Sequence, residues 1–168
     1  MLVPTADWIV RDDDVLCGAE FSDCRTWRYA LYRVWDEALP RLGVFALNPS
    51  IADEVNDDRT VSRLQRFARD WGYGGLNMGN IFAFCATQPR VMKKAENPVG
   101  PENDVWLERL ATDSALMLAA WGVNGRFRHR DRQVLARFRQ LRCLSVTKYG
   151  FPRHPLYVPG DTRHKQYP

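Results

Sequence analysis

Residues 43–54 read GVFALNPSIADE, and this stretch decides the fold that the sequence predicts. An apolar run at 44–47 stops at Asn48, Pro49 and Ser50, and four acidic residues follow between positions 53 and 58. A continuous apolar run is typical of a strand that is buried on both faces of a sheet. The stretch therefore predicts a central strand that ends abruptly in a polar turn.

Segments with the pattern of helices and strands alternate along the rest of the chain. Helices are expected at 58–71, from Pro101 to 114 and at 126–142, and further strands at 74–84, 115–122 and 142–150. This alternation predicts an α/β fold of three layers, α/β/α, with a mostly parallel central sheet of about four strands. Residues 25–35, RTWRYALYRVW, alternate strictly and predict a strand at the edge of that sheet or in a small hairpin, with one side formed by Trp27, Tyr29, Leu31, Arg33 and Trp35.

Length and composition indicate a single globular domain. The chain has 168 residues, of which 45% are hydrophobic and 26% charged. We expect residues 1–40 to form an N-terminal β extension and residues 41–160 to form the core. No apolar run reaches the roughly 18 residues that span a membrane, and the N-terminus does not resemble a signal peptide, so the expected location is the cytoplasm, with no membrane partner.

Cysteine and histidine spacing gives no sign of a bound metal. The four cysteines lack a C-x-x-C motif and the three histidines lack the spacing of metal ligands. Reduced, mostly buried thiols are expected, and neither a metal site nor a cofactor is predicted.

Polar residues are expected at the carboxyl ends of four separate strands. These ends carry Asn48, Asn80, the pair Trp121 and Gly122, and the loop with His154. Ligands of parallel α/β sheets bind at this edge. The four strand ends therefore predict one cleft.

This set of strand ends resembles the uracil-DNA glycosylase superfamily. The segment ALNPS is similar to the water-activating turn of its mismatch-specific branch, and NMGN is similar to the strand end whose Asn reads a flipped base. AAWGVNG is similar to the loop after the third strand, and RHPLY partly matches the His-Pro loop, with Leu156 in place of the usual serine. The resemblance implies a glycosylase-like fold and hydrolysis of the N-glycosidic bond of a damaged or modified base.

Over most of its length the chain also resembles a bacterial and phage family, the domain-of-unknown-function family 1643. The matching stretches are RYALYR, LNPSIADEVNDDRT, GYGGLNMGNIFAF, PVGPENDVWL, AAWG and TKYGFPRHPLY. This resemblance implies no established activity.

The glycosylase resemblance implies roles for individual residues. Asn48 is expected to hold the attacking water, and Asp53 or Asp58 to supply the carboxylate that an amide cannot replace. His154 is expected to stabilise the departing base. Base binding is assigned to Asn80, Phe82 and Trp121. Phe84 is an alternative to Phe82. Most of these residues also have a structural interpretation: turn formation for Asn48, helix capping for the aspartates, a loop-fixing amide for Asn80, loop architecture for His154, and core packing for at least one of Phe82 and Phe84.

A basic segment predicts DNA as a partner. Residues 126–142, RFRHRDRQVLARFRQLR, hold seven arginines and one aspartate, although a solvated helix face explains such a cluster equally well. The expected phosphate contacts are Arg126, Arg128, Arg130, Lys148 and Arg153, and Leu156 and Tyr157 would fill the gap left by a flipped nucleotide.

Three functions remain open from the sequence. The first is a DNA glycosylase-like hydrolase, and the second is a module that binds nucleic acid or a modified base without catalysis. The third is a hydrolase of small nucleosides or nucleotides. Hydrolysis would separate the first from the second, and salt-dependent affinity for duplex DNA would separate both from the third.

Overall fold

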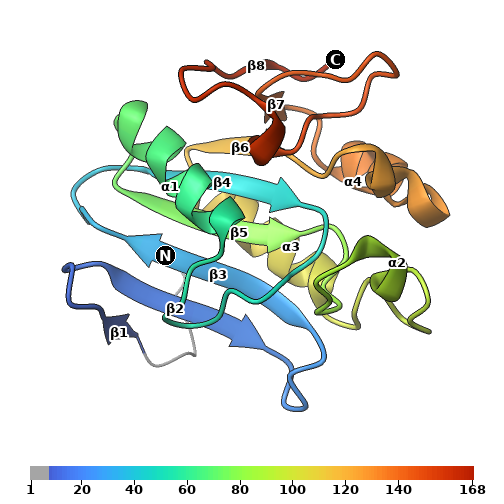
Figure 1. Cartoon of the computed structure of the whole chain (residues 1–168), viewed down its shortest axis with the longest axis horizontal. Helices are drawn as coiled ribbons and strands as arrows, with labels where there is room; N and C mark the ends of the chain where they lie inside the picture. The colour runs from blue at the N-terminus through green and yellow to red at the C-terminus, as the bar shows by residue number, and fades with distance from the viewer. Residues whose placement is uncertain (1–7) are drawn as a thin grey trace.

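One mixed sheet of eight strands organises the computed structural model, which describes residues 8–168 (Figure 1). The strand order is β1-β2-β3-β5-β4-β6-β7-β8. The strands are β1 (Ile9–Val10), β2 (Leu16–Phe21), β3 (Arg28–Val34), β4 (Arg41–Ala46), β5 (Gly75–Asn80), β6 (Leu116–Ala119), β7 (Arg142–Cys143) and β8 (Lys165–Gln166).

The sheet confirms the α/β class and corrects the prediction of a mostly parallel sheet. Parallel pairs join β5 to β4, β4 to β6 and β6 to β7, whereas β1, β2, β3 and β8 are attached by antiparallel pairs. The antiparallel half comes from the N-terminal segment, whose β2–β3 hairpin extends the sheet beyond β5. The last parallel strand is only two residues long, much shorter than the strand expected at 142–150.

Helices pack against both faces of the sheet. On one face, α1 (Arg59–Asp70) buries Val61, Leu64, Phe67 and Ala68 in a core with β4, β5 and β6. On the other, α3 (Asn103–Thr112) and α4 (Arg130–Arg137) contribute Trp106, Leu107, Leu110 and Val134. The remaining helical turns are α2 (Pro89–Met92), η1 (Val123–His129) and η2 (Pro155–Tyr157). No helix of the described residues is long and apolar enough to cross a bilayer.

Helix α1 forms where the sequence predicts it. Asp58 is its N-cap, and the carboxylate accepts a hydrogen bond from the backbone N–H of Val61 at 2.8 Å. Gly72 follows the helix with a φ of +82°, a conformation that glycine adopts without strain.

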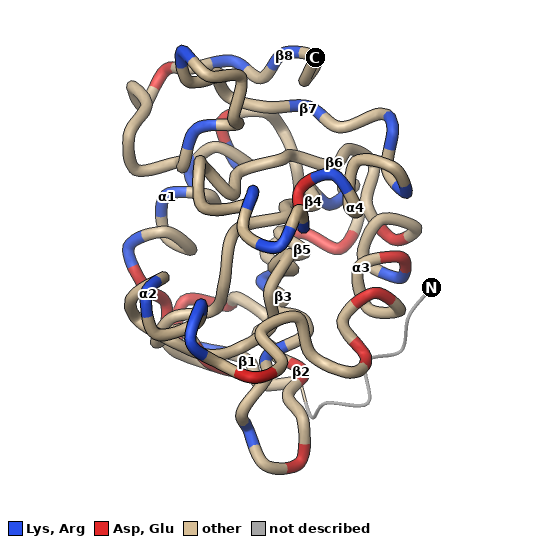
Figure 2. Tube along the Cα trace, turned by 90° about the vertical axis from the view of Figure 1, so that its right-hand side faces the viewer, with Lys and Arg blue, Asp and Glu red and all other residues tan. Residues whose placement is uncertain are grey.

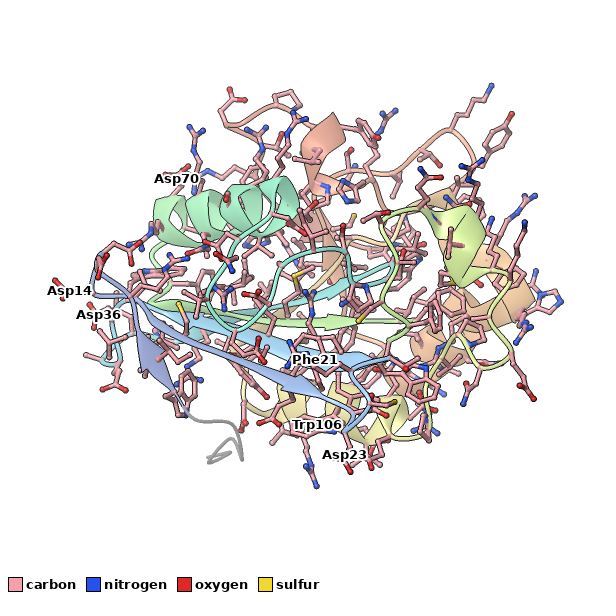
Figure 3. The ribbon with its side chains drawn as sticks, turned by 60° about the horizontal axis from the view of Figure 1, so that its bottom comes forward. Asp14, Phe21, Asp23, Asp36, Asp70 and Trp106 are labelled. Atoms are coloured by element: carbon pink, nitrogen blue, oxygen red, sulfur yellow. The ribbon has the colours of Figure 1, made fainter. Side chains whose placement is uncertain are left out.

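Strand β3 forms a hairpin with β2, one of its two expected placements, but this hairpin is part of the sheet. The other placement, at the sheet edge, is wrong, because β3 lies between β2 and β5 and all seven of its residues are buried. The pairing of β2 with β3 shifts between Glu20 and Phe21, which leaves Tyr29 as an extra residue in β3. A bulge of this kind changes the face on which the following side chains lie. Tyr29 stacks on Trp106 of α3, with ring centroids 6.3 Å apart, and Trp106 is labelled in Figure 3.

The bulge places two arginines on the α1 face. Arg28 and Arg33 are five positions apart, so a regular strand would direct them to opposite faces. Instead, Arg33 binds Asp57 just before α1, and Arg28 donates a hydrogen bond to the carbonyl of Ala52 in the same connection. The strict alternation expected for residues 25–35 therefore does not hold across Tyr29.

The arginine-rich segment is not one helix. It consists of the end of η1, the short helix α4 and an extended stretch that leads into β7, and Arg128 and His129 have positive φ. Arg130 and Arg137 form ion pairs with Asp104 of α3. The segment thus runs beside acidic positions of α3 (Figure 2), and Arg130 and Arg137 are the two of its seven arginines that pair with them.

Candidate functional site

A pocket of about 750 Å³ lies at the carboxyl edge of the parallel strands. Its walls come from the segment after β4, the segment after β6, the loop before η2 and the first turn of α1. Because β3 runs antiparallel to β5, its first residue, Arg28, reaches the same edge. The volume falls within the range of about 300–1,000 Å³ that is typical of small-molecule sites.

Asn48 lines this pocket and also fixes its own turn. Its side-chain Nδ2 donates to the carbonyls of Pro49 at 3.1 Å and Ala86 at 2.7 Å. These bonds occupy the amide nitrogen, so the side-chain oxygen is the atom left for a ligand. An amide oxygen can only accept hydrogen bonds. Asn48 can therefore accept a hydrogen bond from a water but cannot remove its proton.

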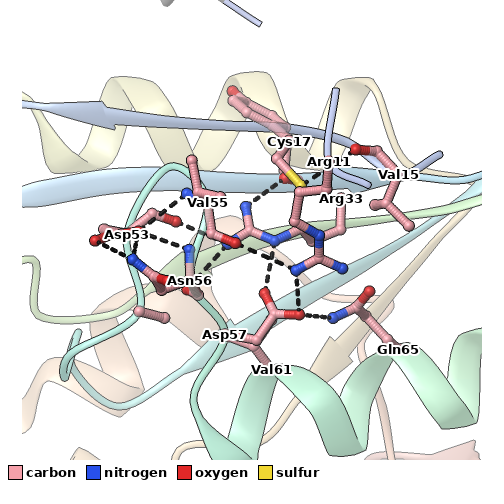
Figure 4. A network of polar contacts seen from close by, with 12 residues as sticks. Arg11, Val15, Cys17, Arg33, Asp53, Val55, Asn56, Asp57, Val61 and Gln65 are labelled. Carbon is pink, nitrogen blue, oxygen red and sulfur yellow. Dashed lines mark hydrogen bonds and ion pairs between the residues drawn. The ribbon is translucent and has the colours of Figure 1, made fainter. Parts of the chain in front are cut away.

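The segment between Asn48 and α1 is held by buried Arg33 (Figure 4). The guanidinium binds Asp57 at 2.7 Å and donates to the carbonyls of Asp53 at 2.7 Å and Asn56 at 3.2 Å. Asp57 also accepts hydrogen bonds from Arg11 and Gln65, both at 2.7 Å. Burial would raise the pKa of Asp57, but the hydrogen bonds from Arg11, Arg33 and Gln65 keep it below its usual value.

Two aspartates of the same segment have different surroundings. Asp53 does not line the pocket, and its carboxylate accepts hydrogen bonds from Val55 and Asn56 within its own turn. Asp58 does line the pocket. One of its oxygens accepts a hydrogen bond from the N–H of Val61, and the carboxylate forms no ion pair among the described residues. Of the two carboxylates considered from the sequence, the geometry thus brings Asp58, not Asp53, to the site of Asn48 and His154.

His154 lines the pocket as a neutral side chain. Its Nδ1 accepts a hydrogen bond from the backbone N–H of Leu156 at 3.2 Å, which leaves the proton on Nε2. Burial lowers the pKa of His154 below its usual value, and the nearby charge of Asp58 opposes that shift. The imidazole is therefore a hydrogen-bond donor at neutral pH.

Only one of the three residues assigned to base binding lines the pocket. Trp121 does so, although its ring is almost fully buried and packs beneath Gly125. Asn80 and Phe82 are buried and lie outside the pocket lining. Phe82 packs against Phe127, with ring centroids 5.9 Å apart, as expected for a core residue. The side-chain amide of Asn80 has no hydrogen-bond partner among the described residues. Base recognition by Asn80 stays a prediction, since this side chain does not line the pocket.

The residues assigned to DNA contacts are also divided. Arg153, Leu156 and Tyr157 line the pocket and are exposed, and Lys148 is exposed outside it. Arg126 and Arg128 are exposed near the pocket residues 123 and 124, whereas Arg130 is buried and bound to Asp104 and to the carbonyl of Ile81. The structure therefore gives Arg130 a packing role and makes it unavailable as a surface contact.

Sequence reasoning missed Arg28, which lines the pocket from a strand expected to lie outside the core. It also missed the pocket hydroxyls Ser50, Thr60 and Thr147. The alternation of residues 25–35 carried no signal for Arg28, because a register shift that depends on β2 decides where that side chain points.

Comparison with known proteins gives one match. A family model described as "Protein of unknown function (DUF1643)" matches residues 28–156. No curated protein and no solved structure matches the chain. The resemblance to uracil-DNA glycosylases receives no support from these comparisons.

Proposed function

The chain belongs to the DUF1643 family, and from its pocket we propose that it is a hydrolase that cleaves the N-glycosidic bond of a nucleotide. The observation that carries the proposal is the convergence of Asn48, Asp58 and His154 on one pocket, the first two from the two ends of the β4–α1 connection and the third from the loop before η2. A water acceptor, an unpaired carboxylate and a neutral donor are the groups that such a hydrolysis requires.

The three side chains divide the reaction between them. Asn48 accepts a hydrogen bond from the attacking water. Asp58 takes a proton from that water while the water oxygen forms a bond to C1′. The bond between C1′ and the base nitrogen breaks, and its electron pair leaves with the base. His154 donates from Nε2 to the base while this charge develops, and the released base takes a proton from solvent.

Release of free base tests the proposal. The substrates are deoxynucleoside monophosphates and oligonucleotides that carry the same normal, deaminated or methylated bases, and the products are separated by chromatography. Asp58→Asn should abolish release while the helix remains capped, because Asn and Asp are equivalent N-caps. His154→Ala should slow release by roughly 10²–10³-fold, the usual effect of losing one such donor.

Asp53→Asn is the matched control, since it removes a carboxylate of the same segment outside the pocket. We expect this variant to retain activity. Equal losses in the two Asn variants would contradict the proposed role of the pocket, and no base release from any substrate by the wild-type protein would refute hydrolysis.

One observation favours a second candidate, a binding module without catalysis. Both hydrogen bonds of the Asn48 nitrogen go to backbone carbonyls, as in a purely structural turn. A binding module would retain a nucleotide in the pocket without releasing its base, and Asp58→Asn would leave its affinity largely unchanged.

A further inference from the structure

Three arginines of the described residues are buried, and they differ in their partners. Arg33 is paired with Asp57 and Arg130 with Asp104. Arg28, with 1% of its surface exposed, forms no ion pair. One of its nitrogens donates to the carbonyl of Ala52, and its Nε has no hydrogen-bond partner among residues 8–168.

A buried charge without a partner is costly, so the state of Arg28 requires an explanation. Burial lowers the pKa of Arg28 to about 10, which still leaves the guanidinium protonated at neutral pH. The nearby Cys85 does not balance this charge, because burial raises the pKa of its thiol. Asp58 lies close enough to raise the pKa of Arg28 but makes no ion pair with it. The cation therefore lacks its anion.

The pocket that Arg28 lines has further donors for an anion. Arg59 and Thr60 form the first turn of α1 and line the pocket, and backbone N–H groups in a first turn have no acceptor within their helix. The Asp58 carboxylate opposes an anion at this end of α1, but one of its oxygens is bound to the N–H of Val61. Asp57, the other carboxylate of the lining, is neutralised by two arginines.

We propose that Arg28 and the first turn of α1 form a subsite for the phosphate of a free mononucleotide. This inference rests on the proposed function and names its substrate class. A phosphate monoester carries about −1.5 to −2 charges at neutral pH and accepts bidentate hydrogen bonds from a guanidinium. Arg28 is buried beneath the pocket, so a terminal phosphate can enter and reach it, whereas the phosphodiester of a polymer backbone stays at the surface.

Binding measured by calorimetry tests the subsite without requiring turnover. The ligands are thymidine, thymidine 5′-monophosphate, deoxyuridine, deoxyuridine 5′-monophosphate, inorganic phosphate and a short single-stranded DNA. The wild-type protein should bind each monophosphate at least about tenfold more tightly than its nucleoside, the effect of one charge-assisted hydrogen bond. Inorganic phosphate should compete with the monophosphates.

Two variants locate the effect. Arg28→Met should remove the preference for the monophosphate, and the protein should remain folded because an apolar side chain is accommodated where an unpaired charge was buried. Arg28→Lys keeps the charge without the planar fork and should retain part of the preference. Arg66→Met is the matched control, an exposed arginine of α1 outside the pocket lining, and should leave the preference unchanged.

Equal affinities of the wild-type protein for nucleosides and monophosphates would overturn the subsite, as would an unchanged preference in Arg28→Met. Tighter binding of the DNA strand than of the monophosphates, lost in Arg28→Met, would overturn the assignment to a free mononucleotide. Phosphate-dependent binding without base release would refute the hydrolase and leave the subsite standing. If nucleosides and their monophosphates bound with equal affinity and released their bases at equal rates, the phosphate subsite would be refuted and the hydrolase would stand.

Discussion

Replacement of Arg33 by methionine should destabilise the protein strongly. Arg33 is fully buried and holds the segment between β4 and α1 through Asp57 and through backbone carbonyls at 53, 54 and 56. Methionine has a comparable length but no donor, so the variant leaves a half-buried carboxylate and several carbonyls without this partner. Asp57 keeps its bonds to Arg11 and Gln65, which limits the loss.

The magnitude follows from this count of partners. Breaking one side of a buried ion pair costs about 3–5 kcal/mol. Arg11 still compensates the charge of Asp57, but the carbonyls at 53, 54 and 56 also lose their donor, so a loss within this range is expected. In a protein of this size 1 kcal/mol corresponds to about 2–4 °C in Tm, so a fall of about 6–20 °C is expected. This loss is a large part of a typical total stability of about 5–15 kcal/mol.

Urea unfolding followed by circular dichroism measures the effect, with Arg25→Met as the matched control. Arg25 binds Glu54 of the same segment at 2.6 Å, but 55% of its side chain is exposed. An exposed pair contributes at most about 1 kcal/mol, so the control should unfold almost as the wild type does. A loss below about 1 kcal/mol for Arg33→Met, or equal losses in the two variants, would refute the role assigned to Arg33.

Two further predictions concern the basic segment and the pocket loop. Arg130→Met should destabilise the protein by several kcal/mol, as expected for a broken buried ion pair, whereas exposed Arg132→Met should not; equal urea midpoints would contradict the packing role of Arg130. The lowered pKa of His154 means that the folded protein binds fewer protons than the unfolded chain, so stability should fall as the pH drops below the ordinary histidine value of about 6.5. This fall should be shallower in His154→Asn, which can still accept from Leu156, and identical pH profiles of thermal unfolding would exclude a contribution from His154.

Local patterns in the sequence were enough to predict several elements. The apolar run before Asn48 predicts β4, and the apolar stripe of residues 61–71, with Asp58 or Thr60 as its cap, predicts α1, where the structure has Asp58. These predictions succeed because a strand buried on both faces and an amphipathic helix each leave a periodic signal within a few residues. The expected meeting of Asn48, Trp121 and His154 at one edge follows from the same logic, since strands that run in one direction end together.

The basic segment shows where a local pattern has two physical solutions. Its charges predict a surface helix that binds phosphates, yet α3 supplies Asp104 and Glu108 as partners for Arg130 and Arg137. The acidic residues lie more than twenty positions away in the sequence, and only the packing of α3 beside α4 brings them together. Charge composition cannot distinguish a free cation from a paired one.

The sequence by itself determined the α/β class, the principal strand β4, the capped helix α1 and the edge at which polar residues gather. The tertiary structure alone decided that β3 is an inner strand and that its arginines face the pocket side. A single unpaired residue, Tyr29, reverses the alternation of side chains, and that bulge arises from the pairing of β3 with β2 rather than from any preference within residues 25–35. Side chains alternate between the two faces of a strand with a period of two. A shift of one residue between strands therefore determines whether Arg28 lies in the core on the α3 face or beneath the pocket.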